Sequence, residues 1–144
     1  MIIKAILNHK APGYISVPPD MKIGSVIHVL AEKNVGAVLV VENEALVGIV
    51  SERDIVRSLA RTPAGTLDLP AEALMTKNLT TGTPQTTIAH AQTLMTEKHF
   101  RHLPILENGK LVGLVSIGDV VKALIDQNQH EVDSLRTYVA GPAL

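Results

Sequence analysis

An internal repeat is the sequence feature that most constrains how this chain can fold. When the sequence is shifted by 65 positions, residues 36–60 align with residues 101–125 without a gap, and ten of the 25 aligned positions are identical. Both copies contain the pattern Gly-x-Val-Ser-x-x-Asp, which begins at Gly48 in the first copy and at Gly113 in the second. A repeated unit of this size cannot bury its apolar face alone, so the two copies are predicted to pack together.

The apolar pattern predicts the same order of elements in both copies, since helical spacing indicates helices and Val- and Leu-rich runs between turns indicate strands. In the first copy these elements are an extended piece (14–17), a helix capped by Asp20, strands at 37–41 and 46–50, and a helix from Ser51 to about residue 60. In the second copy they are an extended piece (79–81), a helix (86–98), strands at 102–106 and 111–115, and a helix to about residue 125. The predicted fold class is therefore α/β of the α+β type, with two β-α-β-β-α repeats packed sheet to sheet about a pseudo-two-fold axis.

The predicted domain organisation follows from the repeat and from the turn-forming residues. The first repeat is assigned to 1–62, a linker to 63–72, the second repeat to 73–126, and a C-terminal helix and tail to 127–144. In the last segment, Val132, Leu135, Tyr138 and Val139 fall on one helical face before Gly141-Pro142. This pattern predicts a short separate helix that docks on the body or on a partner subunit.

Composition narrows the function classes. The chain has 144 residues, 46% of them hydrophobic, with no Cys, so disulfides, thiolate metal sites and Cys nucleophiles are excluded. A formal charge of −1 argues against a broad nucleic-acid surface. The sequence shows no leader and no apolar run near the ~20 residues of a membrane helix, so a cytoplasmic location is expected.

Catalysis and metal binding find no support in the motifs. No Ser stands beside a His base in a recognisable motif, and the glycine-rich loops that bind phosphates or dinucleotides are absent. His99 and His102 are three residues apart but have no acidic or Cys partner at ligand spacing. The chain is therefore expected not to be an enzyme and to hold no metal.

The repeated Ser-x-x-Asp motif has two interpretations. Ser followed three residues later by an acid, just before an apolar helix, is close to a capping box. The same strand-to-helix junction leaves backbone N–H groups and a carboxylate facing one space, which is suited to an anionic or hydroxylated ligand. The glycine that opens each motif is equally open to two explanations, close packing of the backbone or room for a ligand.

The two copies resemble the cystathionine-β-synthase (CBS) domain. The resemblance rests on the order of elements, the Leu-Pro-Ile-Leu strand beginning at Leu103, and the Gly-x-Val-Ser-x-x-Asp signature in both copies, and it covers about residues 5–126. It implies a free-standing tandem CBS pair, a regulatory module that binds adenine nucleotides in the cleft between its repeats. The implied ligand is AMP, with ATP, ADP or NAD(H) as alternatives.

The resemblance also implies roles for individual residues. Asp54 and Asp119 match the aspartate that binds the ribose hydroxyls, and Ser51 and Ser116 match the residue near the phosphate. The residues Tyr14, Ile15, Ser16, Leu79, Thr80 and Thr81 match the extended pieces that lie along adenine, and Arg53, Arg101 and His102 lie where phosphate is approached.

The repeats differ in charge where they are expected to meet a ligand. Arg53 aligns with Gly118, so the first motif is expected to prefer a phosphorylated nucleotide and the second to offer little positive charge. The resemblance further implies signalling to an effector protein and a homodimer formed through helix residues such as Ile55 and Val120, which could instead face their own core. The alternative function is a structural interaction or dimerisation module without a ligand.

Overall fold

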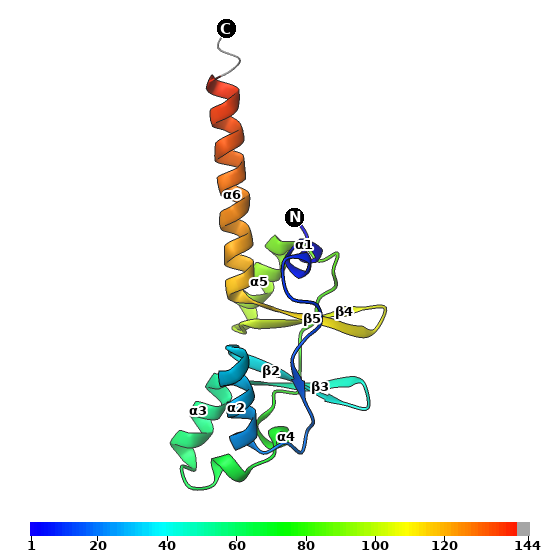
Figure 1. The fold of residues 1–144 in the computed structure, drawn as a ribbon, viewed down its shortest axis with the longest axis vertical. Coiled ribbons are helices and arrows are strands. Elements are labelled where there is room, and N and C mark those ends of the chain that lie inside the picture. Colours follow the sequence, from blue (N-terminus) through cyan, green and yellow to red (C-terminus); the bar gives the residue numbers. More distant parts are fainter. Residues whose placement is uncertain (141–144) are drawn as a thin grey trace. The chain divides into compact units, whose positions relative to one another are not determined.

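The computed structural model describes residues 1–140 and confirms a mixed α+β fold with two copies of one supersecondary unit (Figure 1). The first copy comprises β1 (Ser16–Val17), α2 (Ile23–Lys33), β2 (Ala37–Glu42), β3 (Ala45–Ser51) and α3 (Glu52–Arg61). The second copy comprises α5 (Ile88–Lys98), β4 (His102–Glu107), β5 (Lys110–Ser116) and α6 (Ile117–Ala140). Three further elements are α1 (Ile3–Asn8), the 3-10 helix η1 (Thr66–Asp68) and α4 (Ala71–Leu74). None of the helices described is both long and apolar enough to cross a membrane.

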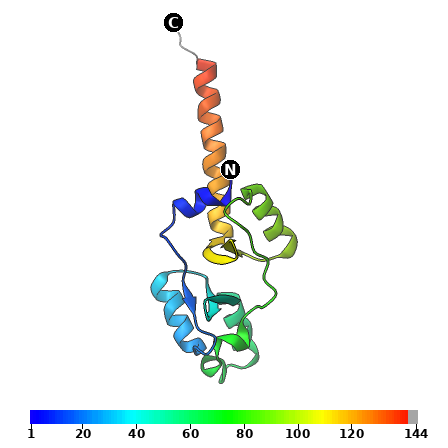
Figure 2. The same ribbon diagram turned by 90° about the vertical axis from the view of Figure 1, so that its right-hand side faces the viewer.

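The chain forms two compact units whose boundaries do not follow the repeats (Figure 2). The central unit contains residues 13–81 together with 104–113. The terminal unit contains residues 1–12, 82–103 and the chain from 114 onward. The N-terminal residues therefore belong to the unit that holds most of the second copy.

The central unit is built on the three-stranded sheet β1-β2-β3. Ser16 pairs in parallel with Leu39, and β2 pairs antiparallel with β3. Residues 37–40 are buried without interruption, which is why this strand reads as a continuous apolar run. The buried core of the central unit also contains residues from the neighbouring elements: Val17, Ile23, Val26, Leu30, Val50, Ile55 and Ala71.

The connecting segment of the central unit is folded rather than extended. Thr66 is fully buried, and its Oγ1 lies 2.8 Å from Ser58 Oγ and donates to the carbonyl of Thr62 at 2.8 Å. The backbone N–H of Ile23 donates to the carbonyl of Leu69 at 2.8 Å. The residues predicted to form a linker thus pack against the first copy.

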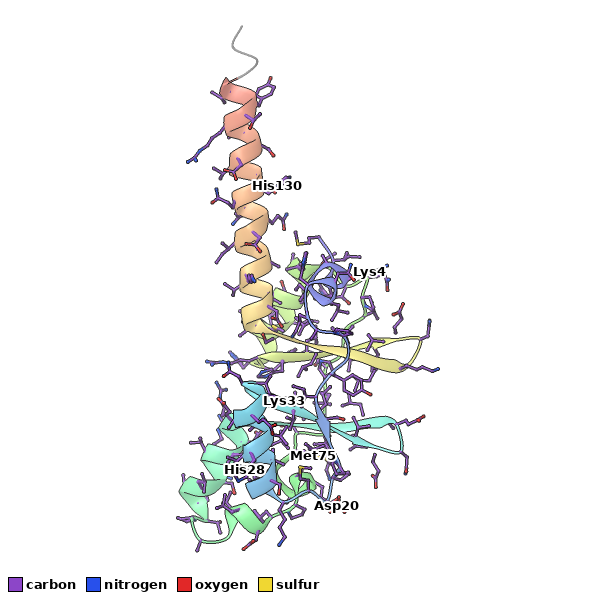
Figure 3. The ribbon with its side chains drawn as sticks, in the orientation of Figure 1. Lys4, Asp20, His28, Lys33, Met75 and His130 are labelled. Atoms are coloured by element: carbon purple, nitrogen blue, oxygen red, sulfur yellow. The ribbon has the colours of Figure 1, made fainter. Side chains whose placement is uncertain are left out.

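The start of α2 corrects one prediction. Asp20, which is labelled in Figure 3, was expected to cap this helix. Lys22 occupies the N-cap position instead, and no side chain provides a capping hydrogen bond. The N-cap must lie directly before the first helical residue, and Asp20 lies two positions too early. The positive charge of Lys22 instead pairs with Asp68 across an exposed 3.9 Å contact.

The terminal unit contains a helix that the sequence analysis did not predict. Ile3 and Ile6 of α1 are buried, and the backbone N–H of Ile3 donates to the carbonyl of Thr86 at 2.8 Å. The N–H of Ile88 donates back to Met1 at 3.1 Å. Six residues are too few for an isolated helix, so α1 depends on this tertiary docking.

The C-terminal helix corrects a second prediction. Two helices were expected after Ser116, whereas α6 is one continuous helix through Ala140. The residues between the expected helices, Asp126 to Asn128, include no Gly or Pro, so nothing interrupts the backbone hydrogen bonds. The expected stop at Gly141-Pro142 lies outside the described residues.

The positions expected to form a dimer through α3 and α6 are also corrected. Ile55 is 4% exposed and Val120 is fully buried, so both face the core of their own unit. Their neighbours Val56 and Val121 are exposed instead, and further exposed apolar residues lie along α6. The alternative interpretation of Ile55 and Val120, as core residues, is therefore correct.

The turn between β2 and β3 contains a strained residue. Asn43 and Glu44 both adopt positive φ (51° and 66°), as do Asn108 and Gly109 in the equivalent turn (52° and 77°). Two-residue hairpins of this kind favour Asn-Gly because a side chain is disfavoured in the left-handed region. Only the second copy has glycine at the second turn position.

Replacing Glu44 by glycine is expected to raise the free energy of unfolding by about 1 kcal/mol, because relief of left-handed strain exceeds the entropic cost of glycine. Urea unfolding with an unchanged m value would measure this gain. Gly109→Glu is the matched reverse control and should lose a similar amount. A Glu44→Gly variant no more stable than the parent would contradict the assignment of strain to this turn.

Candidate ligand-binding site

The motif of the central unit forms a complete capping box at the start of α3. Ser51 is the N-cap residue, and the backbone N–H of Asp54 donates to its Oγ at 3.3 Å. In return, the backbone N–H and the hydroxyl of Ser51 both donate to Asp54 Oδ2 at 2.9 Å. The strand thus passes directly into the helix, and the box fixes the carboxylate at the junction.

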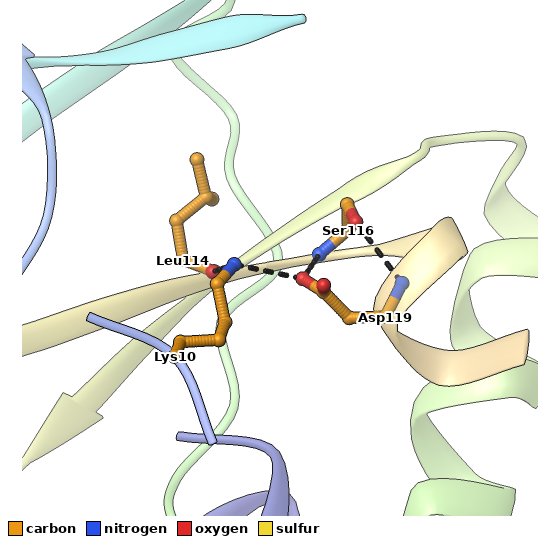
Figure 4. A network of polar contacts seen from close by, with 4 residues as sticks. All are labelled: Lys10, Leu114, Ser116 and Asp119. Atoms are coloured by element: carbon orange, nitrogen blue, oxygen red, sulfur yellow. Dashed lines mark hydrogen bonds and ion pairs between the residues drawn. The ribbon is translucent and has the colours of Figure 1, made fainter. Parts of the chain in front are cut away.

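The motif of the terminal unit repeats this geometry at the start of α6 (Figure 4). The backbone N–H of Ser116 donates to Asp119 Oδ2 at 2.8 Å, and the N–H of Asp119 donates to Ser116 Oγ at 3.1 Å. The capping interpretation of Ser-x-x-Asp is therefore correct in both copies.

The capping hydrogen bonds leave one oxygen of each aspartate carboxylate available to a ligand. The hydrogen bonds of both boxes end on Oδ2, and the structure assigns Oδ1 of neither Asp54 nor Asp119 a partner among residues 1–140. Both side chains are half-buried and so retain access to solvent. Since an ionised carboxylate is an acceptor only, each Oδ1 can accept a hydrogen bond from a hydroxyl. The cap and the ligand interpretations are thus compatible.

A cation that the sequence analysis missed completes the motif of the terminal unit. Lys10 Nζ lies 2.8 Å from Asp119 Oδ2 and donates to the carbonyl of Leu114 at 2.9 Å (Figure 4). The expectation that this motif has little positive charge is therefore wrong. Lys10 stands just after α1, far from the repeat in sequence, and no motif signals it.

This contact governs the ionisation of Asp119. Burial favours the neutral acid and so raises the pKa of Asp119. The hydrogen bonds from Lys10 and from the Ser116 N–H favour the carboxylate, and their combined effect on the pKa is larger than that of burial. The net result is a pKa below the ordinary value of 3.8. Asp119 is therefore ionised at neutral pH, so that both of its oxygens act as hydrogen-bond acceptors.

The other predicted site residues are distributed over both units. In the central unit, Arg53 and Ser16 are exposed, Tyr14 is 40% exposed, and the carbonyl of Ile15 accepts a hydrogen bond from Leu39 at 3.1 Å. Leu79, Thr80 and Thr81 of the same unit lie outside the regular strands and helices.

In the terminal unit, Arg101 is exposed and His102 is half-buried at the start of β4. The carbonyl of Arg101 accepts from the N–H of Ile117 at 2.8 Å. Gly36 makes the equivalent bond with Glu52 at 3.0 Å, so both copies tie the start of one strand to the start of the following helix. The geometry brings Ser51 together with Asp54, and Ser116 together with Asp119 and Lys10. Whether Arg101 and His102 act with the motif of the central unit stays a prediction.

The glycine that opens the first motif is explained by packing. A Cβ on Gly48 would lie 2.5 Å from Sδ and 2.7 Å from Cγ of Met75, which follows α4 in the same unit. The space beside Gly48 is thus filled by a side chain of the connecting segment. Of the two explanations for this glycine, close packing is the correct one.

Comparisons with known proteins agree with the duplicated fold. Residues 4–61 and 71–126 match the family model described as the CBS domain. The chain is 34% identical over 127 residues to the CBS domain-containing protein CBSX3, mitochondrial, of Arabidopsis thaliana; the match covers 85% of this chain and 62% of that protein.

Two solved structures are similar over most of their length. The CBS-domain containing protein ATU1752 from Agrobacterium tumefaciens is 37% identical, with a TM-score of 0.83 over 85% of this chain and 98% of that chain. The CBS domain protein PAE2072 from Pyrobaculum aerophilum, solved in complex with AMP, is 30% identical, with a TM-score of 0.73 over 83% of this chain and 89% of that chain.

Proposed function

Because the chain belongs to the CBS domain family and carries two copies of the domain, we propose that it is a regulatory module that binds an adenine nucleotide. The observation that carries the proposal is the repeated junction at which capping engages Oδ2 of an aspartate and leaves Oδ1 for a ligand hydroxyl. The similarity of the chain to the CBS domain protein PAE2072, which was solved in complex with AMP, supports this ligand class.

AMP is the proposed ligand, and ATP, ADP or NAD(H) would use the same interactions. Asp54 and Asp119 would accept hydrogen bonds from ribose hydroxyls, and the helix N-termini favour negative charge nearby. We propose that the phosphate is contacted by Arg53, Arg101 and His102. The guanidinium of an arginine can bind phosphate through two parallel hydrogen bonds. That both motifs face one cleft is part of the same proposal.

Binding is proposed to act by a shift between two arrangements of the repeats, which requires that the ligand bind one arrangement more tightly. Energy or redox sensing would follow from the choice of nucleotide. We further propose that the protein forms a homodimer, signals to an effector protein and is located in the cytoplasm. The proposed function contains no catalytic step.

Asp54→Asn and Asp119→Asn test the ligand contact. Asparagine keeps one oxygen for the N–H of the N-cap serine but replaces the second acceptor by an NH₂ donor. Each variant that contributes to a site should weaken AMP binding about tenfold or more by calorimetric titration. Asp126→Asn, on the exposed surface of α6, is the matched control.

Flat titrations of the parent protein with AMP, ADP, ATP, NAD(H) and adenosine would overturn the proposal and favour an interaction module without a ligand. Mass spectrometry of small molecules released from freshly purified protein would identify a nucleotide that co-purifies.

The charge difference between the copies can be tested with Arg53→Ala and Lys10→Ala, each titrated with AMP and with adenosine. A preference for phosphate that depends on Arg53 alone would assign phosphate recognition to the first motif.

A further inference from the structure

Helix α6 of the terminal unit carries a stripe of exposed apolar residues along most of its length. We call Val121, Ile125, Val132, Leu135 and Val139 the α6 stripe. Their side chains are between 44% and 76% exposed. The helix has packed its other apolar face already, because Val120 is fully buried and Leu124 is half-buried. α6 thus has two apolar faces, and only one is covered by the chain itself.

The stripe follows the spacing of a coiled coil. From Val121 to Ile125 is four residues, and Val132, Leu135 and Val139 follow at intervals of seven, three and four. The interval of seven contains Asn128, which completes an alternation of four and three. In heptad notation, Ile125, Val132 and Val139 occupy a positions, and Val121, Asn128 and Leu135 occupy d positions.

We propose that the α6 stripe pairs with the same stripe of a second copy of this chain, as a parallel two-stranded coiled coil. All three a positions are β-branched and one of the three d positions is Leu135, and β-branched residues at a with Leu at d favour parallel dimers. This inference concerns the assembly step of the proposed function and does not depend on nucleotide binding.

The flanking charges agree with a parallel partner. Glu131 is at a g position and Arg136 is at the e position five residues later, which is the pairing made between the helices of a parallel dimer. Neither residue forms an ion pair within residues 1–140. In a two-fold dimer, each Glu131 would meet the other chain's Arg136, so two opposite-charge pairs flank the stripe.

The length of α6 supports a partner for the same surface. Its 24 residues span about 36 Å at 1.5 Å per residue. Its C-terminal half extends past α1 and α5 of the same unit, and side chains such as His130 project from it (Figures 1 and 3). Residues 128–139 are all exposed, so this part of α6 lacks the packing of an apolar face that supplies most helical stability in proteins. Pairing with a second copy supplies that packing.

Leu135→Glu is the first test, made in the full-length chain by sedimentation velocity across a concentration series. A charge in the seam should raise the dimer dissociation constant about 100-fold or more, because it would be buried without a partner. Thr137→Glu, at the outer f position, is the matched control and should leave the dissociation constant unchanged. An unchanged dimer in Leu135→Glu, or a monomeric parent chain, would overturn the proposal.

Orientation can be tested by cross-linking, because the chain contains no Cys. Leu135→Cys should form an intermolecular disulfide under mild oxidation, since a parallel pair brings equivalent d positions together. Ser134→Cys, at the outer c position, should not. Failure of Leu135→Cys to cross-link would overturn the parallel arrangement.

The charged pair provides a third readout. Glu131→Arg alone and Arg136→Glu alone should each weaken the dimer, whereas the double exchange should restore it. In an antiparallel pair these residues would not face each other, so single variants without effect would contradict the proposal. AMP titration of Leu135→Glu is expected to match the parent protein, which separates failure of this interface from failure of nucleotide binding.

Discussion

Replacing Gly48 by alanine is expected to lower the free energy of unfolding by about 2 to 3 kcal/mol. The new Cβ would lie 2.5 Å from Met75 Sδ and 2.7 Å from Met75 Cγ, separations that Cβ atoms essentially never show in folded proteins. It would also lie 3.0 Å from Met75 Cβ, which is tighter than most such contacts. The thioether can rotate away, but the Met75 Cβ moves only with the backbone. Inserting a methyl group into a filled site usually costs this much.

A double-mutant cycle with Met75→Ala identifies the cause. If the Gly48→Ala cost arises from Met75, it should fall by at least about 1 kcal/mol in the Met75→Ala background, because contacting residues are not additive. Gly118→Ala is a control in the first turn of α6, where a Cβ would lie 3.6 Å from Ser116 Oγ, an ordinary contact. It should be neutral or stabilising. The same Gly48→Ala cost in both backgrounds would contradict this explanation.

Removing the aspartate from the two motifs is expected to have unequal effects. Asp54→Ala deletes the acid of a capping box and should cost about 1 kcal/mol. Asp119→Ala deletes the same contact and also leaves Lys10 without its carboxylate, so it should cost about 2 kcal/mol in total. Thermal or urea unfolding of both variants would measure the difference, and equal costs would show that the Lys10 contact contributes no stability.

The Lys10 contribution should depend on pH with a defined sign. The pKa of Asp119 is depressed in the folded protein, so its contribution to stability is present above the unfolded pKa and is lost as the pH falls through the folded pKa. Lys10→Met should therefore be less stable than the parent at neutral pH, and the gap should narrow on acidification below about pH 4. In an Asp119→Ala background the same Lys10→Met change should cost little at any pH.

Features with a local cause were predictable from the sequence. The β-α-β-β-α order follows from apolar spacing, and the capping boxes follow from Ser and Asp three residues apart, because both depend on neighbouring residues of one element. The 65-residue repeat then showed that the motif occurs twice. The resemblance to CBS domains followed from these same local patterns.

Features that depend on distant segments required the tertiary structure. Lys10 and Asp119 are 109 residues apart, and no local pattern could pair them. Gly48 was ambiguous until Met75 was seen beside it, and Val120 could face a partner or its own core until its burial was known. The sequence by itself determined a duplicated fold with two aspartate-bearing helix starts, since short-range hydrogen bonds and periodicity encode them. Only the tertiary structure decided which lysine completes the second motif and which face of α6 is left exposed, because those depend on long-range packing.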